Sequence, residues 1–194
     1  MIESLSGEFA ILDRVVHPAY GPGLITAVEQ MDAAIAGFRR YYVIDIYEQN
    51  LTVRVPVRRA DRLGLRSVMS RDRVGNVLQT LSSAPNSLPG DYKQRQATIR
   101  ERIKVTRPTE LAEVIRDLFR YGEKNHLTSV DTQLLRSSMD RLAWEMACAA
   151  DSTPGDSLAE INRALAAPSN AGQQPALPRE SPENPIKTLQ PSAA

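Results

Sequence analysis

The sequence of 194 residues contains one cysteine, two histidines and one tryptophan, and only 5% of its residues are aromatic. A single cysteine, Cys148, cannot form an intramolecular disulfide, which fits a reducing compartment. No apolar run approaches the ~20 residues that a membrane-spanning helix needs. The first four residues, Met1 to Ser4, lack the basic and apolar regions of a signal peptide. We therefore expect a cytoplasmic protein without a membrane partner.

Patterns typical of catalysis or metal binding are also scarce. His17 and His126 have no second ligand at metal-binding spacing, and an ordinary hydrogen bond is the favoured role of His17 in a predicted turn. Cys148 lies among alanines on a predicted helix, which favours a buried apolar role over a nucleophile. The Gly-Pro-Gly segment at 21–23 lacks the Lys-Ser/Thr step of a phosphate-binding loop. We expect no enzyme, cofactor, metal or small-molecule ligand, and favour contact with a macromolecule.

The net charge of +1 is unevenly distributed along the chain. Residues 1–50 carry three Arg against seven Asp or Glu, whereas residues 51–73 carry seven Arg against two Asp. Residues 91–107 carry six Lys or Arg against two acidic residues. Such basic stretches attract polyanions without regard to sequence. Solvated faces of helices and strands would give the same composition, and both interpretations stay open.

Short apolar runs separated by Gly, Pro or polar residues dominate the first third of the chain. They are rich in Val, Ile and Tyr, which favours strands. Gln49-Asn50 has the length of a tight hairpin turn. Because closure removes exposed strand edges, four to five short strands favour a small SH3- or Tudor-like β-barrel over residues 7–67. The predicted strands are 13–17, 24–30, 41–47 and 51–55.

From Ser70 the apolar period becomes helical, and we predict an all-α domain of about five helices over residues 70–167. Ser70 is the predicted N-cap of the first helix. A basic helix is predicted over 92–105. Pro108 suits the first turn of the helix that follows it.

Two further helix starts are predicted from capping-box spacing, in which a Ser or Thr is followed three residues later by an acidic residue. Thr128 with Asp131 marks the fourth helix, and Ser157 with Glu160 marks a fifth. Trp144 lies in the predicted fourth helix, where packing between helices is favoured over stacking on a nucleic acid.

The composition changes again after Ala167, to Pro, Ser, Ala, Gln and Asn. Such a segment buries too little apolar area to offset the entropy cost of ordering it. We therefore predict that residues 168–194 form a disordered tail. The predicted fold is α+β, with a small N-terminal β-barrel, a C-terminal helical domain and this tail.

The run from Leu51 to Pro56 is the strongest candidate for a contact surface. In a strand, Leu51, Val53 and Val55 share one face, whereas Thr52 and Arg54 lie on the other. The apolar face can then pack inside the protein while Arg54 faces a partner. Pro56 marks the end of pairing, because it cannot donate to a sheet ladder.

Taken in order, these segments resemble the CarD/CdnL family of bacterial transcription regulators, over roughly residues 7–166. The most specific signal is the Leu-Thr-Val-x-Val-Pro run at 51–56 together with the His-Pro-x-x-Gly turn at 17–21. The other matching segments are Phe9–Val16, Tyr41–Ile44, Gly64–Arg66, Val114–Arg120 and Leu127–Ser129.

The resemblance implies a two-part adaptor, and we expect it to be a monomer. The barrel, similar to the polymerase-interacting domain of transcription-repair coupling factors, would dock on the β subunit of RNA polymerase. The helical domain would contact promoter DNA near the upstream edge of the −10 element and alter open-complex stability. By position, Arg54 matches an arginine that contacts the β subunit in the family. Val53, Val55 and Pro56 would shape that strand for pairing with a partner strand.

The DNA contacts that the resemblance implies lie in the basic segment after residue 90. Members of the family carry a tryptophan wedge at the start of the first basic helix, where this chain has Asp91 followed by Tyr92. Tyr92 would either replace the wedge or pack against a neighbouring helix. Two basic positions of the family's fourth helix correspond here to Thr132 and Gln133. The candidate phosphate contacts are Lys93, Arg95, Arg100, Arg102 and Lys104.

A second function remains open at this stage. With Asp91, Thr132 and Gln133 at these positions, the chain has fewer residues suited to DNA than the resemblance implies. It would therefore also fit a protein-interaction module that binds polymerase or another partner without engaging DNA.

Overall fold

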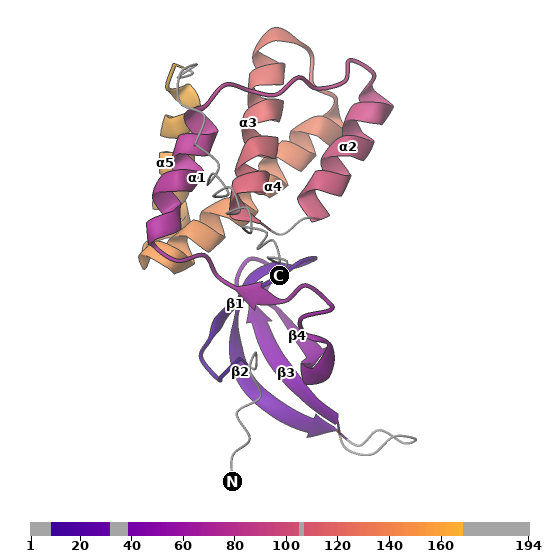
Figure 1. The fold of residues 1–194 in the computed structure, drawn as a ribbon, viewed down its shortest axis with the longest axis vertical. Helices are drawn as coiled ribbons and strands as arrows, with labels where there is room; N and C mark the ends of the chain where they lie inside the picture. The colour runs from indigo at the N-terminus through magenta and orange to yellow at the C-terminus, as the bar shows by residue number, and fades with distance from the viewer. Residues whose placement is uncertain (1–8, 32–38, 105–106, 169–194) are drawn as a thin grey trace, which may run out of the picture.

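The computed structural model describes residues 9–31, 39–104 and 107–168, and it shows a β-sheet domain followed by a helical domain (Figure 1). The described residues form five strands, one short 3-10 helix and five α-helices, with every strand before the first α-helix. This arrangement confirms the α+β class, with a small Tudor-like barrel followed by helices. The predicted tail lies outside the described residues, apart from Pro168.

The strands form one antiparallel sheet in the order β4-β3-β2-β1-β5. Each of the four predicted strands is present. The fifth has no signal in the sequence, because two residues are too few to show a period. The strands are β1 (Arg14–His17), β2 (Gly21–Met31), β3 (Arg39–Ile46), β4 (Leu51–Pro56) and β5 (Arg66–Ser67).

Two tight features fix how β2, β3 and β4 pair. The turn predicted at Gln49-Asn50 is present but longer than two residues, because Ile46 pairs with Leu51 and residues 47–50 form the turn. Its last residue, Asn50, adopts a φ of 47°, a left-handed conformation that asparagine tolerates. Gly23 allows β2 and β3 to approach closely, because a Cβ on this residue would lie 2.6 Å from the carbonyl oxygen of Asp45. Any side chain at position 23 would therefore push the two strands apart.

The sheet curls around its own apolar core, which confirms the barrel shape but leaves it open. Among the described strands, β4 pairs only with β3 and β5 pairs only with β1, so both remain edges. The 3-10 helix η1 (Val57–Arg59) begins the connection between these edges. The core of the barrel consists of Val15, Ile25, Tyr42, Ile44, Ile46, Val55, Ala60 and Leu65.

The five α-helices bury a larger core of their own, in which α1, α3, α4 and α5 meet. A smaller cluster around Ile99, Val114 and Leu118 attaches α2 to α3. The helices are α1 (Asp72–Ser82), α2 (Tyr92–Lys104), α3 (Pro108–Lys124), α4 (Ser129–Ala150) and α5 (Pro154–Ala166).

Two of the predicted helix starts are confirmed. Pro108 is at the first position of α3, where its missing N–H costs nothing. The Thr128 hydroxyl accepts from the Asp131 backbone N–H at 3.1 Å, and the Asp131 carboxylate accepts from the Thr128 N–H. These reciprocal bonds form the capping box that begins α4.

Helix α2 also begins at the predicted residue, whereas two predicted N-caps are wrong, Ser70 for α1 and Ser157 for α5. The N-cap of α1 is Arg71, and no side chain caps it; Ser70 instead accepts a bond from Arg73 through its backbone carbonyl. Helix α5 begins one turn earlier than predicted, with Thr153 as its cap. Ser157 lies inside α5 and is buried, because the apolar face of this helix extends over it.

No helix in the described ranges is long and apolar enough to cross a membrane. The described strands and helices run from Arg14 to Ala166.

Candidate functional site

Strand β4 is an edge of the sheet, and no other strand in the described ranges pairs with its outer side. Figure 1 shows the α-helices stacked at one end of the barrel, with none of them along β4. Val55 is 1% exposed in the barrel core, and Val53 packs partly against it. Arg54 lies on the opposite face and is exposed, and Pro56 is the last residue of the strand. The predicted division of faces is therefore confirmed for Val53, Val55 and Arg54, whereas Leu51 at the start of the strand is 38% exposed. An edge strand such as β4 can pair with a strand of a partner.

Arg54 forms an ion pair with a carboxylate of the same chain, that of Glu29. The Arg54 Nε donates to Glu29 Oε2 at 2.9 Å, reaching from β4 across β3 to β2. This bond raises the pKa of Arg54 further above its usual value. Both side chains are about half exposed, so a partner's carboxylate can compete with Glu29. Sequence reasoning missed Glu29 because it is 25 residues away and only the sheet register brings the two together.

The start of α2 presents an aromatic ring beside a positive charge. Tyr92 is 49% exposed, and the Lys93 ammonium lies 5.9 Å from the centroid of its ring. Tyr92 is therefore not packed in the helical core, which is evidence against the interpretation that it packs on a neighbouring helix. Asp91 accepts the backbone N–H of Gln94 at 2.9 Å, which gives the aspartate a capping role where the family has a tryptophan.

Arg95 is a correction, because a buried guanidinium cannot reach a phosphate. Its side chain is 2% exposed and donates to the Asp131 carboxylate at 2.7 Å. It also donates to the Tyr121 hydroxyl and to the carbonyls of Pro89 and Gly90. Arg95 therefore ties α2 to α4 and to the segment before α2, and does not belong to the DNA surface.

Two other predicted phosphate contacts are engaged with carboxylates. Arg102 donates to Asp117 and to Glu113 of α3, each at 2.9 Å, with 27% of its side chain exposed. Lys104 pairs with Glu101 at 2.7 Å on an exposed face, where such a pair is weak. Of the predicted set, Tyr92, Lys93 and Arg100 are exposed on α2 without an ion pair in the described chain.

The two domains are joined by a buried charge on α4. Glu145 is 1% exposed and receives two bonds from the Arg66 guanidinium of β5, at 2.6 and 2.9 Å. It also accepts the backbone N–H of Met69 in the interdomain connection at 3.1 Å. Bidentate pairing of this kind fixes both distance and angle. The barrel is thus oriented against the helices by a pair that neither domain contains alone.

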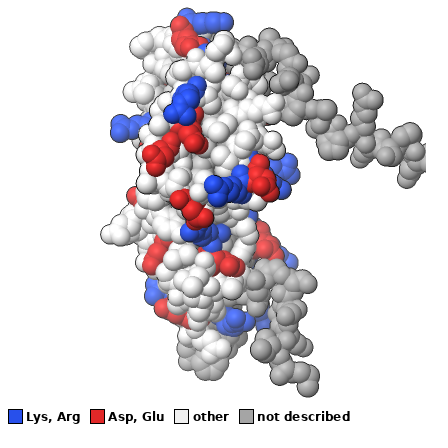
Figure 2. All heavy atoms as spheres, turned by 90° about the vertical axis from the view of Figure 1, so that its left-hand side faces the viewer, with Lys and Arg blue, Asp and Glu red and all other residues white. Residues whose placement is uncertain are grey.

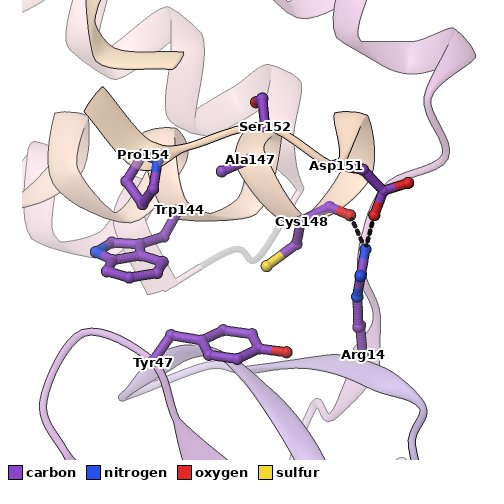
Figure 3. Close-up of a pocket in the computed structure, with 8 residues that line it drawn as sticks. All are labelled: Arg14, Tyr47, Trp144, Ala147, Cys148, Asp151, Ser152 and Pro154. Carbon is purple, nitrogen blue, oxygen red and sulfur yellow. Dashed lines mark hydrogen bonds and ion pairs between the residues drawn. The ribbon is translucent and has the colours of Figure 1, made fainter. Parts of the chain in front are cut away.

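Aromatic contact and a cleft extend this interface (Figure 3). The ring of Trp144 stacks on Tyr47, with centroids 5.9 Å apart and planes 8° from parallel. Trp144 is therefore a packing anchor as predicted, but between domains instead of between helices. Beside the pair lies a cleft of about 320 Å³, closed on one side by Arg14 and Asp151 at 2.6 Å.

Cys148 and His17 have the unreactive roles that the sequence predicted. Cys148 lines the cleft and is half-buried, and burial raises the pKa of its thiol to about 11, so the nucleophilic thiolate is absent near neutrality. His17 Nδ1 accepts the backbone N–H of Ala19 at 3.1 Å. Burial, together with the positive charge of Arg141, lowers the pKa of His17.

The face in Figure 2, which is the left-hand side of Figure 1, carries Lys and Arg side chains interspersed with Asp and Glu. Mixed charge of this kind is typical of a solvated surface. On this face the described residues form no patch of a single charge.

Comparison with known families covers both domains. A model of the CarD-like/TRCF RID domain matches residues 9–69, and a model described as "CarD, C-terminal domain" matches residues 76–162. The two matches follow each other in the chain and include the strand edge and α2.

The chain belongs to the CarD family. This confirms the family that the sequence resembles, and makes the chain a member of a family of bacterial transcription factors. One relative in the CarD family is a protein of Bacillus subtilis (strain 168) named "Putative transcription factor YdeB". It is 27% identical over 138 residues, which cover 71% of this chain and 90% of the relative.

Helix α2 carries the residues that were predicted to contact DNA. Its first turn has an aspartate cap and an exposed tyrosine, and two of its cations are bound to acidic residues of other helices. The described residues contain no group of three or more His, Cys, Asp or Glu side chains placed to hold a metal ion.

Proposed function

We propose that this protein is a monomeric transcription regulator that docks on the RNA polymerase β subunit through its barrel. Its helical domain contacts promoter DNA near the upstream edge of the −10 element and alters the stability of the open complex. The polymerase holds the protein in place, so the DNA contact can be weak and independent of sequence.

The observation that carries the docking proposal is the outer edge of β4, which pairs with no other strand in the described ranges. A partner strand can add to β4 through backbone hydrogen bonds. Val53 and Val55 hold the edge in position from the barrel side, Pro56 ends the strand, and Arg54 gives the added strand a charge to recognise. The match to the CarD-like/TRCF RID domain over residues 9–69 supports polymerase as the partner.

Charge reversal at the edge tests this proposal. Arg54→Glu places a carboxylate beside Glu29, and we expect it to weaken binding to the isolated β subunit in a pull-down or titration. Arg73→Glu, an exposed arginine on α1, is the matched control and should bind as the wild type does. Equal binding by both variants, with folding intact by circular dichroism, would contradict docking through β4.

The DNA part of the proposal depends on Tyr92 with Lys93 and Arg100. An exposed aromatic beside two cations can stack on or insert at a base step while the cations contact phosphates. We expect Tyr92→Ala to reduce the effect of the protein on open-complex lifetime, so that the lifetime at saturating protein approaches the value measured without the protein. The affinity for polymerase should stay unchanged. An identical lifetime with and without the wild-type protein would remove this part of the proposal.

A second function is favoured by the burial of Arg95 and the internal pairing of Arg102. Both remove positive charge from the surface that the family uses for DNA, which favours a module that binds polymerase without engaging DNA. The Lys93→Glu/Arg100→Glu variant discriminates between the two functions. Loss of the effect on lifetime with polymerase binding retained supports DNA contact, whereas an unchanged effect supports the module.

A further inference from the structure

The loop that connects the two edge strands of the sheet carries positive charge with no ion-pair partner among the described residues. This basic loop (residues 57–65) connects β4 to β5 and contains Arg58, Arg59 and Arg62. All three arginines are exposed, and no carboxylate in the described residues forms an ion pair with any of them. Asp61 is the one acidic residue in the loop.

The basic loop is held in a defined conformation. Ala60 and Leu65 are each 4% exposed and belong to the barrel core. The Leu63 N–H donates to the Arg59 carbonyl at 2.8 Å, and the Leu65 N–H donates to the Ala60 carbonyl at 3.0 Å. The arginines are therefore presented from an anchored backbone, which lowers the entropy cost of binding.

Other arginines of the chain are paired with carboxylates. Arg95, Arg102 and Arg66 each have a carboxylate at 2.6–2.9 Å. The three arginines of the basic loop lie within five residues of each other in the sequence and have no ion pair in the described residues, so a negatively charged partner would supply the missing counter-charge.

The position of the basic loop favours a protein partner over a nucleic acid. It follows Pro56 directly, so a strand added to β4 continues toward it. Leu63, within the loop, is 46% exposed, and interfaces between proteins combine apolar and charged contacts in this way. On these grounds we infer that the basic loop binds an acidic segment of the protein whose strand pairs with β4. The inference rests on the proposed docking function and adds the chemistry of the partner.

The test compares two variants of the full chain that lose the same charge. The first is Arg58→Gln/Arg59→Gln/Arg62→Gln, and the control is Arg71→Gln/Arg73→Gln/Arg163→Gln, whose arginines are exposed elsewhere. Binding to RNA polymerase core enzyme is titrated at several KCl concentrations. We expect the loop variant to bind about tenfold more weakly at low salt, with a shallower salt dependence than the control. Asp61→Asn, which removes the local acid, should bind more tightly than the wild type.

Three outcomes would overturn the inference or separate it from the docking proposal. Wild-type affinity in the loop variant, with Arg54→Glu weakened, would overturn the basic loop and leave β4 docking intact. If the loop variant loses affinity for a labelled DNA duplex and keeps its affinity for polymerase, the inference is overturned in favour of a nucleic-acid surface. Absence of polymerase binding by the wild type would remove the docking proposal and the inference together.

Discussion

At the scale of single residues, the Arg95–Asp131 pair determines how α2 is held against α4. Both side chains are at most 2% exposed, and such a pair is costly to break from one side because the other charge stays buried. We expect Arg95→Met to lower the free energy of unfolding by about 3 kcal/mol in urea titration. Lys93→Met, on the exposed face of the same helix, should change it by no more than about 0.5 kcal/mol. Equal effects would mean that Arg95 is not held as described.

Acid should weaken the same pair. Burial by itself would raise the pKa of Asp131, but the bonds from Arg95 and Thr128 outweigh it, so this pKa is lowered in the folded protein. A carboxyl with a lowered folded pKa stabilises the fold above its unfolded pKa, and this contribution disappears as the pH falls through the folded value. We expect the stability gap between the wild type and Asp131→Asn to be constant near neutrality and to narrow below about pH 4. A gap independent of pH would contradict the pairing.

At the scale of elements, the cap of α5 is Thr153. Its hydroxyl accepts the Asp156 N–H at 3.1 Å, and Pro154 follows at the first position of the helix. Thr153→Ala should therefore destabilise the protein by about 1 kcal/mol in thermal or urea unfolding. Glu160→Ala, at the position that capping-box spacing pointed to, should have little effect because Glu160 is exposed in mid-helix. The reverse ranking would place the cap at Ser157.

At the scale of the whole molecule, the sole tryptophan reports on domain packing. Trp144 stacks on Tyr47 across the interface, next to the buried pair of Glu145 and Arg66. We expect Tyr47→Ala to shift Trp144 fluorescence to longer wavelength and to raise its quenching by acrylamide, because the indole gains contact with water. Tyr92→Ala, which changes an exposed tyrosine remote from the stack, is the control. An unchanged spectrum in Tyr47→Ala would mean that the interface opens in solution.

Local patterns in the sequence determined four of the five strands and the division of faces on β4. They also placed the first residue of four of the five helices to within two residues. They succeed because alternation, proline and capping residues act over a few positions. The start of α4 was predictable from Thr128 and Asp131, since both partners of the cap lie within one turn. The family followed from the ordered motifs in the same way.

Tertiary structure alone decided which charges are free. Arg95 and Arg54 both belong to basic stretches of the sequence, yet one is buried on Asp131 and the other is held at the surface by Glu29. Their partners are 36 and 25 residues away and approach only when helices pack and strands align. The same holds for Glu145, which joins the domains by binding Arg66 at a separation of 79 residues. Charge along the chain is a property of composition, whereas charge available to a partner depends on which carboxylates the fold brings within hydrogen-bonding distance.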